Sequence, residues 1–169
     1  MVELLIVIGV IGVMAAGLLY LLDPLGQIRK ANDAKRKSDL EQLQRTLEVY
    51  YNDNGKYPVY SVAPDPLYRI KPPTGYIEWV SVWTSYNTTL PKDPTPSARN
   101  YVYYASSTDG QSYFLYASLE KSGDPQLCSP LNVNGECPSI TTNGITANSC
   151  GPSPGKPCNY GASSPNVNP

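Results

Sequence analysis

Residues 2–22 read VELLIVIGVIGVMAAGLLYLL, so that one carboxylate, Glu3, precedes nineteen residues without a charge. An apolar helix of about 20 residues can cross the hydrocarbon core of a bilayer. A carboxylate at the edge of such a segment is costly in lipid, which predicts a partner for Glu3. The simpler interpretation is a single-pass anchor in which Glu3 only complements the helix dipole. A secretory signal peptide is disfavoured because the run is long and the residues before it carry no basic charge.

The composition excludes several classes of function. The 169 residues allow one modest domain beyond the apolar run, and the net charge of −1 gives no sign of a nucleic-acid binder. Histidine is absent, which removes the commonest general base and zinc ligand. We therefore expect no enzyme activity, no cofactor and no metal. Asp109, Glu120 and Asp124 could meet near a hairpin and bind calcium, but turn and solvent roles are the simpler interpretation.

The cysteines predict an oxidising compartment. Cys128, Cys137, Cys150 and Cys158 all lie in the last quarter of the chain, in a segment rich in Pro, Gly and Asn. An even count in such a segment is typical of disulfides, and the spacing is too open for paired zinc ligands. Three pairings are possible. The sequential one is preferred because it closes two short loops.

A basic cluster just after the apolar run argues for a cytoplasmic domain, whereas the cysteines argue for a domain outside the cytoplasm. Its members would be retained in the cytoplasm by the positive-inside rule: Arg29, Lys30, Lys35, Arg36 and Lys37. The conflict disappears if a basic leader is removed from the N-terminus. The cysteines therefore decide the expected orientation, with the domain outside the cytoplasm.

The helix is expected to continue beyond the apolar run. Asp23 and Pro24 should interrupt it, because proline removes a backbone donor and clashes with the preceding turn. Apolar residues then recur at spacings of three and four, which predicts one buried stripe made of Leu40, Leu43, Leu47 and Tyr50. Gly55 suits a left-handed cap at its end. The middle of this helix is polar and has no obvious partner within the chain.

Four segments follow from these patterns: an apolar helix over 1–24, an amphipathic helix over 25–54, a globular domain over 55–125 and a cysteine-containing region over 126–169. Within the domain, 76–83 is the best strand candidate. Alternating residues over 101–119 with a turn at 108–110 predict a β-hairpin with one buried face. The last segment has too few bulky apolar residues for a core of its own and is expected to depend on its disulfides.

The N-terminal residues resemble those of bacterial type IV pilins and pseudopilins. The resemblance rests on Val2 to Ile8 with the Gly/Ala-spaced run after it, on 47–58, on Leu-Pro-Lys-Asp-Pro at 90–94 and on the tyrosines at 101–104. It covers about residues 2–120 and implies an α+β pilin fold, with a long helix docked on a small antiparallel sheet. At 95–97, Thr-Pro-Ser replaces the Trp-Gly expected of secretion pseudopilins, which favours a pilus subunit.

The resemblance also implies roles for particular residues. Glu3 would pair with the N-terminal amine of a neighbouring subunit and set the register of a helical filament. Small residues would allow close helix packing in the filament core: Gly9, Gly12, Ala15, Ala16 and Gly17. Asp23 and Pro24 would let the helix unwind. Charged residues of the polar stretch could form ion pairs between subunits: Arg29, Lys35 and Arg36 with Asp33 and Asp39.

Three functions remain open at this point. The first is a major pilin of an extracellular filament, serving adhesion or motility. The second is a pseudopilin of a type II secretion or DNA-uptake apparatus, and the third is a monomeric adhesin or receptor on a membrane anchor. The first two imply a homopolymer, residence in the inner membrane before assembly, a prepilin peptidase that also methylates the new N-terminus, and an assembly machinery.

Overall fold

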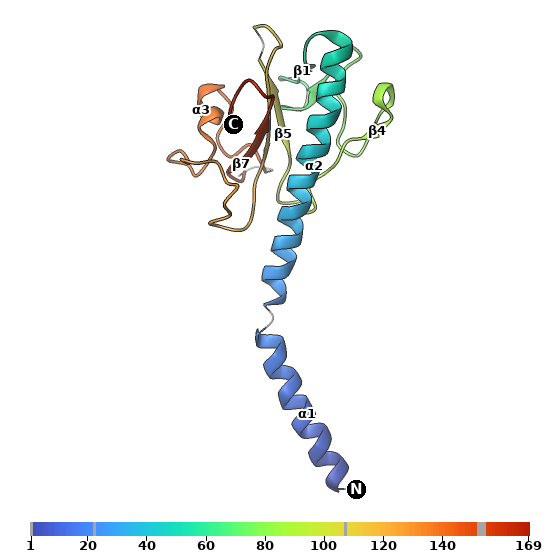
Figure 1. Ribbon diagram of the computed structural model, residues 1–169, viewed down its shortest axis with the longest axis vertical. Coiled ribbons are helices and arrows are strands. Elements are labelled where there is room, and N and C mark those ends of the chain that lie inside the picture. The colour runs from blue at the N-terminus through green and yellow to red at the C-terminus, as the bar shows by residue number, and fades with distance from the viewer. Residues whose placement is uncertain (1, 22, 107, 152–154) are drawn as a thin grey trace.

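Two successive helices form the stalk of the molecule (Figure 1). The computed structural model describes residues 2–21, 23–106, 108–151 and 155–169. Helix α1, Val2–Leu21, extends away from the rest of the chain, and helix α2, Pro24–Asn54, packs its second half on a globular domain. Met1 and Leu22 belong to the predicted segment 1–24 but lie outside the described residues.

Asp23 lies at the interruption between the helices. Its backbone is left-handed, with φ of 37°, and its carboxylate accepts a hydrogen bond from the Gly26 backbone N–H at 3.1 Å. Pro24 follows as the first residue of α2, where its missing N–H costs nothing. Gly55 ends α2 with φ of 69°, the left-handed cap that the sequence predicts.

The predicted stripe of α2 is confirmed as the centre of the core. Leu40, Leu43 and Leu47 are completely buried and Tyr50 is nearly so. They pack against Tyr101, Tyr103, Leu115 and other residues on one face of a sheet. Burial of each such side chain contributes roughly 1.5–3 kcal/mol, so this stripe fixes α2 on the domain.

A three-stranded antiparallel sheet faces α2. Its order is β5 (Val102–Ala105), β6 (Tyr113–Ala117) and β7 (Tyr160–Ser163), with Leu115 opposite Tyr103 on one side and Ala162 on the other. Two short ribbons lie between α2 and this sheet in the chain: β1 (Val59–Tyr60) with β2 (Ile70–Lys71), and β3 (Val82–Trp83) with β4 (Thr88–Thr89). A 3₁₀ turn, η1 (Thr84–Tyr86), joins β3 to β4. The α+β pilin fold is therefore confirmed.

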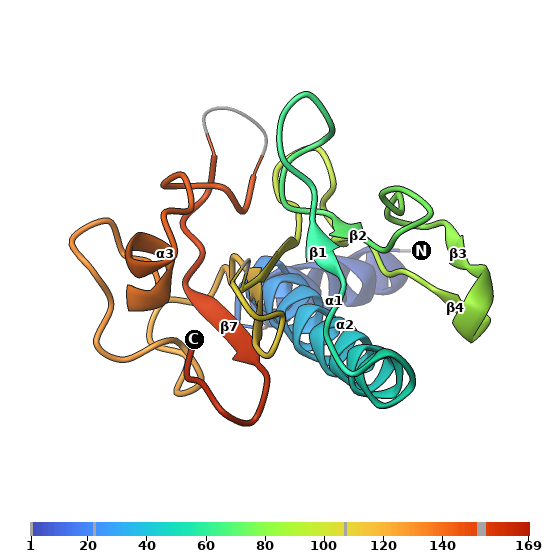
Figure 2. The same ribbon diagram turned by 90° about the horizontal axis from the view of Figure 1, so that it is seen from above.

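The predicted hairpin is present, but both of its faces are covered. Tyr103 and Leu115 face α2, whereas Val102, Phe114 and Tyr116 contribute to a second core on the opposite side. All five residues of β6 are buried. The expectation of a single buried face is wrong because the C-terminal region folds over the other face (Figure 2).

That C-terminal region supplies more structure than its composition predicts. It contributes helix α3 (Pro138–Thr142) and the edge strand β7. The disulfides join Cys128 to Cys137 and Cys150 to Cys158, which is the preferred sequential pairing. Three of these cysteines are completely buried and pack with Ile140 and Ile145 in the second core.

The strand predicted over 76–83 is wrong in most of its length. Only Val82 and Trp83 are paired in a strand. The chain turns just before them, where the Ser81 N–H donates to the Glu78 carbonyl and Val80 has φ of 73°. This turn prevents a continuous extended segment.

Candidate functional site

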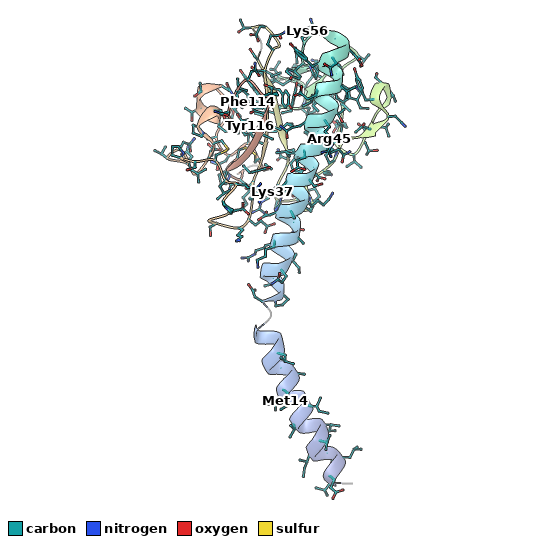
Figure 3. The ribbon with its side chains drawn as sticks, in the orientation of Figure 1. Met14, Lys37, Arg45, Lys56, Phe114 and Tyr116 are labelled. Carbon is teal, nitrogen blue, oxygen red and sulfur yellow. A yellow bond between two sulfur atoms is a disulfide. The ribbon has the colours of Figure 1, made fainter. Side chains whose placement is uncertain are left out.

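Within the described part of the chain, the apolar side chains of helix α1 make no contact with the globular domain and are exposed. From Val2 to Leu18, its large apolar side chains are between 52% and 76% exposed. Figure 3 shows Met14 and its neighbours projecting from the stalk, far from the globular domain. An apolar surface of this extent on one helix marks an interaction site.

Small residues of α1 have no packing role within the subunit. A Cβ added at Gly9, Gly12 or Gly17 would meet no described atom within 4 Å. Ala15 and Ala16 are exposed as well. Close packing of these positions against another helix therefore stays a prediction.

Glu3 lies in the first turn of α1 and is exposed. Within the part of the chain that the structure describes, its carboxylate forms no ion pair. Its predicted partner, the amine of a neighbouring subunit, is not tested here. Among the described residues, no helix is both long and apolar enough to cross a membrane.

A buried group of charges joins the middle of α2 to two distant loops. We call it the Arg36 cluster, and its members are Asp33, Arg36, Asp93, Thr95 and Glu120. The guanidinium of Arg36 binds Asp93 with two hydrogen bonds, Nε to Oδ2 at 2.7 Å and Nη2 to Oδ1 at 3.0 Å. It also donates to Asp33 at 2.7 Å, to Glu120 at 3.0 Å and to the Thr95 hydroxyl at 2.9 Å.

The charges of this cluster stabilise one another. Both Arg36 and Asp93 have completely buried side chains. Burial alone would raise the pKa of Asp93, but hydrogen bonds from Arg36 and from Thr95 outweigh it and hold that pKa below its usual value. Burial likewise opposes the charge of Arg36, yet its bonds to Asp93 and the other carboxylates raise its pKa. Arg36 and Asp93 therefore form a buried ion pair in which each charge stabilises the other.

The cluster also positions the loop after β6. Both oxygens of Asp33 accept the Glu120 backbone N–H, at 2.9 and 3.1 Å, and Oδ2 also accepts the Lys121 N–H at 2.9 Å. Nearby, Lys37 binds Asp124 of the same loop at 2.8 Å. Ion pairs and hydrogen bonds thus hold the polar middle of α2 on the globular domain, whereas the buried leucine stripe holds the C-terminal half of α2.

Asp33, Arg36 and Asp39 already have partners within the subunit, so ion pairs between subunits through them stay a prediction. Asp33 and Arg36 are buried in the cluster, and Asp39 accepts hydrogen bonds from Lys35 at 3.2 Å and from the Tyr101 hydroxyl at 2.7 Å. Helical periodicity shows only which residues share a face and not which loops return to it. The sequence signal that could have indicated the Arg36 cluster was the 90–94 segment, because it contains Asp93.

Arg29 differs from the other residues predicted to form such pairs. It is exposed near the start of α2 and takes part in no ion pair among the described residues. The calcium alternative is not supported, because Asp109 lies in the β5–β6 turn whereas Glu120 and Asp124 follow the opposite end of β6. Within the described ranges, no group of three acidic, Cys or His residues could hold a metal ion.

A comparison with protein families assigns the chain. The family model described as type II secretion system protein G matches residues 24–125, well over half of the chain. The chain belongs to this pseudopilin family. No curated protein and no solved structure matches it significantly.

The family match corrects the ranking of functions. A pseudopilin is supported, and a major pilin is not supported specifically, although Thr95-Pro96-Ser97 favoured one. Thr95 has a structural role in this pseudopilin, since its N–H and hydroxyl both donate to Asp93, at 2.7 and 2.9 Å. The matched region begins at the first residue of α2 and contains the whole Arg36 cluster.

Proposed function

We propose that this chain is the structural subunit of a pseudopilus in a type II secretion apparatus, and that it polymerises through α1. The exposed apolar surface of α1 carries the proposal, because the subunit itself leaves that surface uncovered. A filament of many copies would cover it with identical surfaces. Membership of the pseudopilin family supports the same reading.

The apolar burial available from α1 is comparable with the cost of association. Its exposed large apolar side chains include Leu4, Leu5, Ile6, Ile8 and Ile11. Relative to exposure to water, burying each of them fully would contribute roughly 1.5–3 kcal/mol, so these five alone supply on the order of 10 kcal/mol to a filament that has left the bilayer. The step out of the bilayer gains none of this energy, because lipid tails are as apolar as leucine. Association costs about 4–15 kcal/mol in lost translational and rotational freedom, and the burial energy lies within that range.

Glu3 would then set the axial register of the filament. Within a core of apolar helices, an unpaired carboxylate costs several kcal/mol, and a neighbour's N-terminal amine would neutralise it. Only one axial offset between subunits brings the two charges together. The small residues Gly9, Gly12 and Gly17 would allow close approach of the helices at that offset.

The proposal implies partners and a location. The inner membrane would hold the subunit before assembly, and a prepilin peptidase would process and methylate its N-terminus. The secretion machinery would then build the periplasmic filament. The disulfides Cys128–Cys137 and Cys150–Cys158 agree with a periplasmic domain.

Complementation in the source bacterium tests this function. A strain lacking the gene is complemented with the wild-type chain, with Glu3→Ala, or with Glu41→Ala as a control at an exposed carboxylate of α2. We expect the wild type and the control to restore secretion of exported proteins, and Glu3→Ala to lose it with normal protein levels. Abundant long surface filaments without a secretion defect would instead indicate a pilus. A chain that functions regardless of Glu3→Ala would indicate a monomeric anchor.

A further inference from the structure

A small basic pocket lies where α2 meets the loop after β6. It holds about 230 Å³ and is lined by Asp23, Gly26, Arg29, Lys30, Glu120, Lys121 and Ser122. Two segments about 90 residues apart in the sequence build it. The first turns of α2 supply Arg29 and Lys30, and the loop supplies Lys121.

The Arg36 cluster fixes the geometry of this pocket. Asp33 accepts the backbone N–H groups of Glu120 and Lys121, at 2.9–3.1 Å, one turn beyond Arg29 and Lys30 on the helix. Arg36 holds the Glu120 side chain at 3.0 Å. Lys121 is therefore held beside the start of α2 by groups that are themselves buried.

The pocket carries a net positive charge. Its two carboxylates are already engaged, Asp23 as the cap of the Gly26 N–H and Glu120 in its ion pair with Arg36. Arg29, Lys30 and Lys121 are exposed, and among the described residues none of them forms an ion pair. Three basic residues thus line one small concavity.

The position of the pocket relative to α1 indicates its ligand. At 1.5 Å per residue of helix, Arg29 and Lys30 lie about 8–9 Å beyond Pro24, the first residue of α2, along its axis. The headgroup layer of a bilayer is about 5–8 Å thick, and Lys and Arg side chains extend their charges toward it. With α1 inserted in the membrane, as the proposed function requires, the pocket lies just outside the phosphates, and the long side chains of Arg29 and Lys30 reach back to them.

We propose that this pocket binds the phosphate headgroup of an anionic phospholipid while the subunit waits in the inner membrane. The inference rests on the proposed membrane stage. Such contacts contribute about 1 kcal/mol per basic residue, or about fivefold in affinity. They also give a role to basic residues that the positive-inside rule would otherwise place in the cytoplasm.

Native mass spectrometry of the full-length chain tests the pocket. The chain is purified in a mild detergent and mixed with equal amounts of phosphatidylglycerol and phosphatidylcholine. The test variant is Arg29→Gln/Lys30→Gln/Lys121→Gln. The control, Lys56→Gln/Lys92→Gln/Lys156→Gln, removes the same charge from exposed positions elsewhere.

We expect the wild type and the control to retain phosphatidylglycerol in preference to phosphatidylcholine. The test variant should lose that preference, by roughly 100-fold if each side chain contributes fully. Circular dichroism and tryptophan fluorescence should show that both variants fold. Arg29→Lys should keep most of the preference, because a cation remains.

Three results would overturn the proposal. They are equal retention of both lipids by the wild type, an equal loss in the control variant, or binding of a short DNA duplex that requires the three residues and exceeds lipid binding. The readout does not depend on polymerisation. A wild type that shows no lipid preference but supports Glu3-dependent secretion would reject only the pocket. A wild type with the preference but without Glu3-dependent secretion would reject only the proposed filament.

Discussion

Replacing Asp93 with asparagine tests the Arg36 cluster as the main polar attachment of α2. Asp93 accepts two hydrogen bonds from Arg36, at 2.7 and 3.0 Å, and both side chains are completely buried. Removing one partner of a buried ion pair typically costs about 3–5 kcal/mol, since the other charge is left uncompensated. Arg36 keeps Asp33 and Glu120, so we expect a cost near the lower end, about 3 kcal/mol.

Urea unfolding of the full-length chain in a mild detergent measures this cost. Trp79 and Trp83 are the only tryptophans and both lie in the globular domain, so their fluorescence reports on its unfolding. Lys35→Gln is the matched control, because its ion pair with Asp39 is 55% exposed on the lysine side and should be worth less than about 1 kcal/mol. A free energy of unfolding for Asp93→Asn within about 1 kcal/mol of the wild type would refute the reasoning.

Three further changes should affect stability in known directions. Tyr101→Phe removes the hydroxyl that donates to buried Asp39 at 2.7 Å. It should lower the free energy of unfolding in urea by about 1–3 kcal/mol, and an unchanged free energy would contradict that hydrogen bond. Cys150→Ser/Cys158→Ser should cost about 2–5 kcal/mol and should increase proteolysis of the C-terminal region before the rest of the chain. Because the folded-state pKa of Asp93 lies below its ordinary 3.8, its stabilisation is present above about pH 4 and is lost as the pH falls through that lower value. The urea midpoint should therefore fall on acidification less steeply in Asp93→Asn than in the wild type, and equal slopes would contradict this assignment.

Periodic patterns predicted the parts of the fold that repeat locally. The stripe from Leu40 to Tyr50 has helical spacing and is buried as expected. Alternation of Tyr103 and Leu115 with their neighbours likewise predicted the β5–β6 hairpin. In both cases the spacing of apolar residues within one element predicts which of its side chains are buried, because that spacing follows the geometry of the helix or strand.

Contacts between distant segments could not be predicted in this way. Arg36 pairs with Asp93, 57 positions away, and nothing in the spacing of α2 distinguishes this arginine from its exposed neighbours. Strand β7 lies in a segment of small residues, and its pairing with β6 depends on a return of the chain stapled by disulfides. Family resemblance supplied part of this information, since the 90–94 segment contains Asp93.

The proposed roles of residues on α1 depend on contacts between subunits. The structure shows which side chains a single subunit leaves uncovered, and these include Glu3 and Met14. The register that Glu3 would set is a property of the assembly and not of one subunit. The sequence alone suggested this role only through the resemblance to pilins.

Cryo-electron microscopy of filaments formed by the wild-type chain tests the central claim most directly. The expected reconstruction buries α1 of every subunit along the filament axis and places the Glu3 carboxylate within about 4 Å of an N-terminal amine of a neighbour. Globular domains should cover the outside, with the Arg36 cluster intact in each subunit. Filaments joined only through their globular domains, with α1 outside the core, would contradict it.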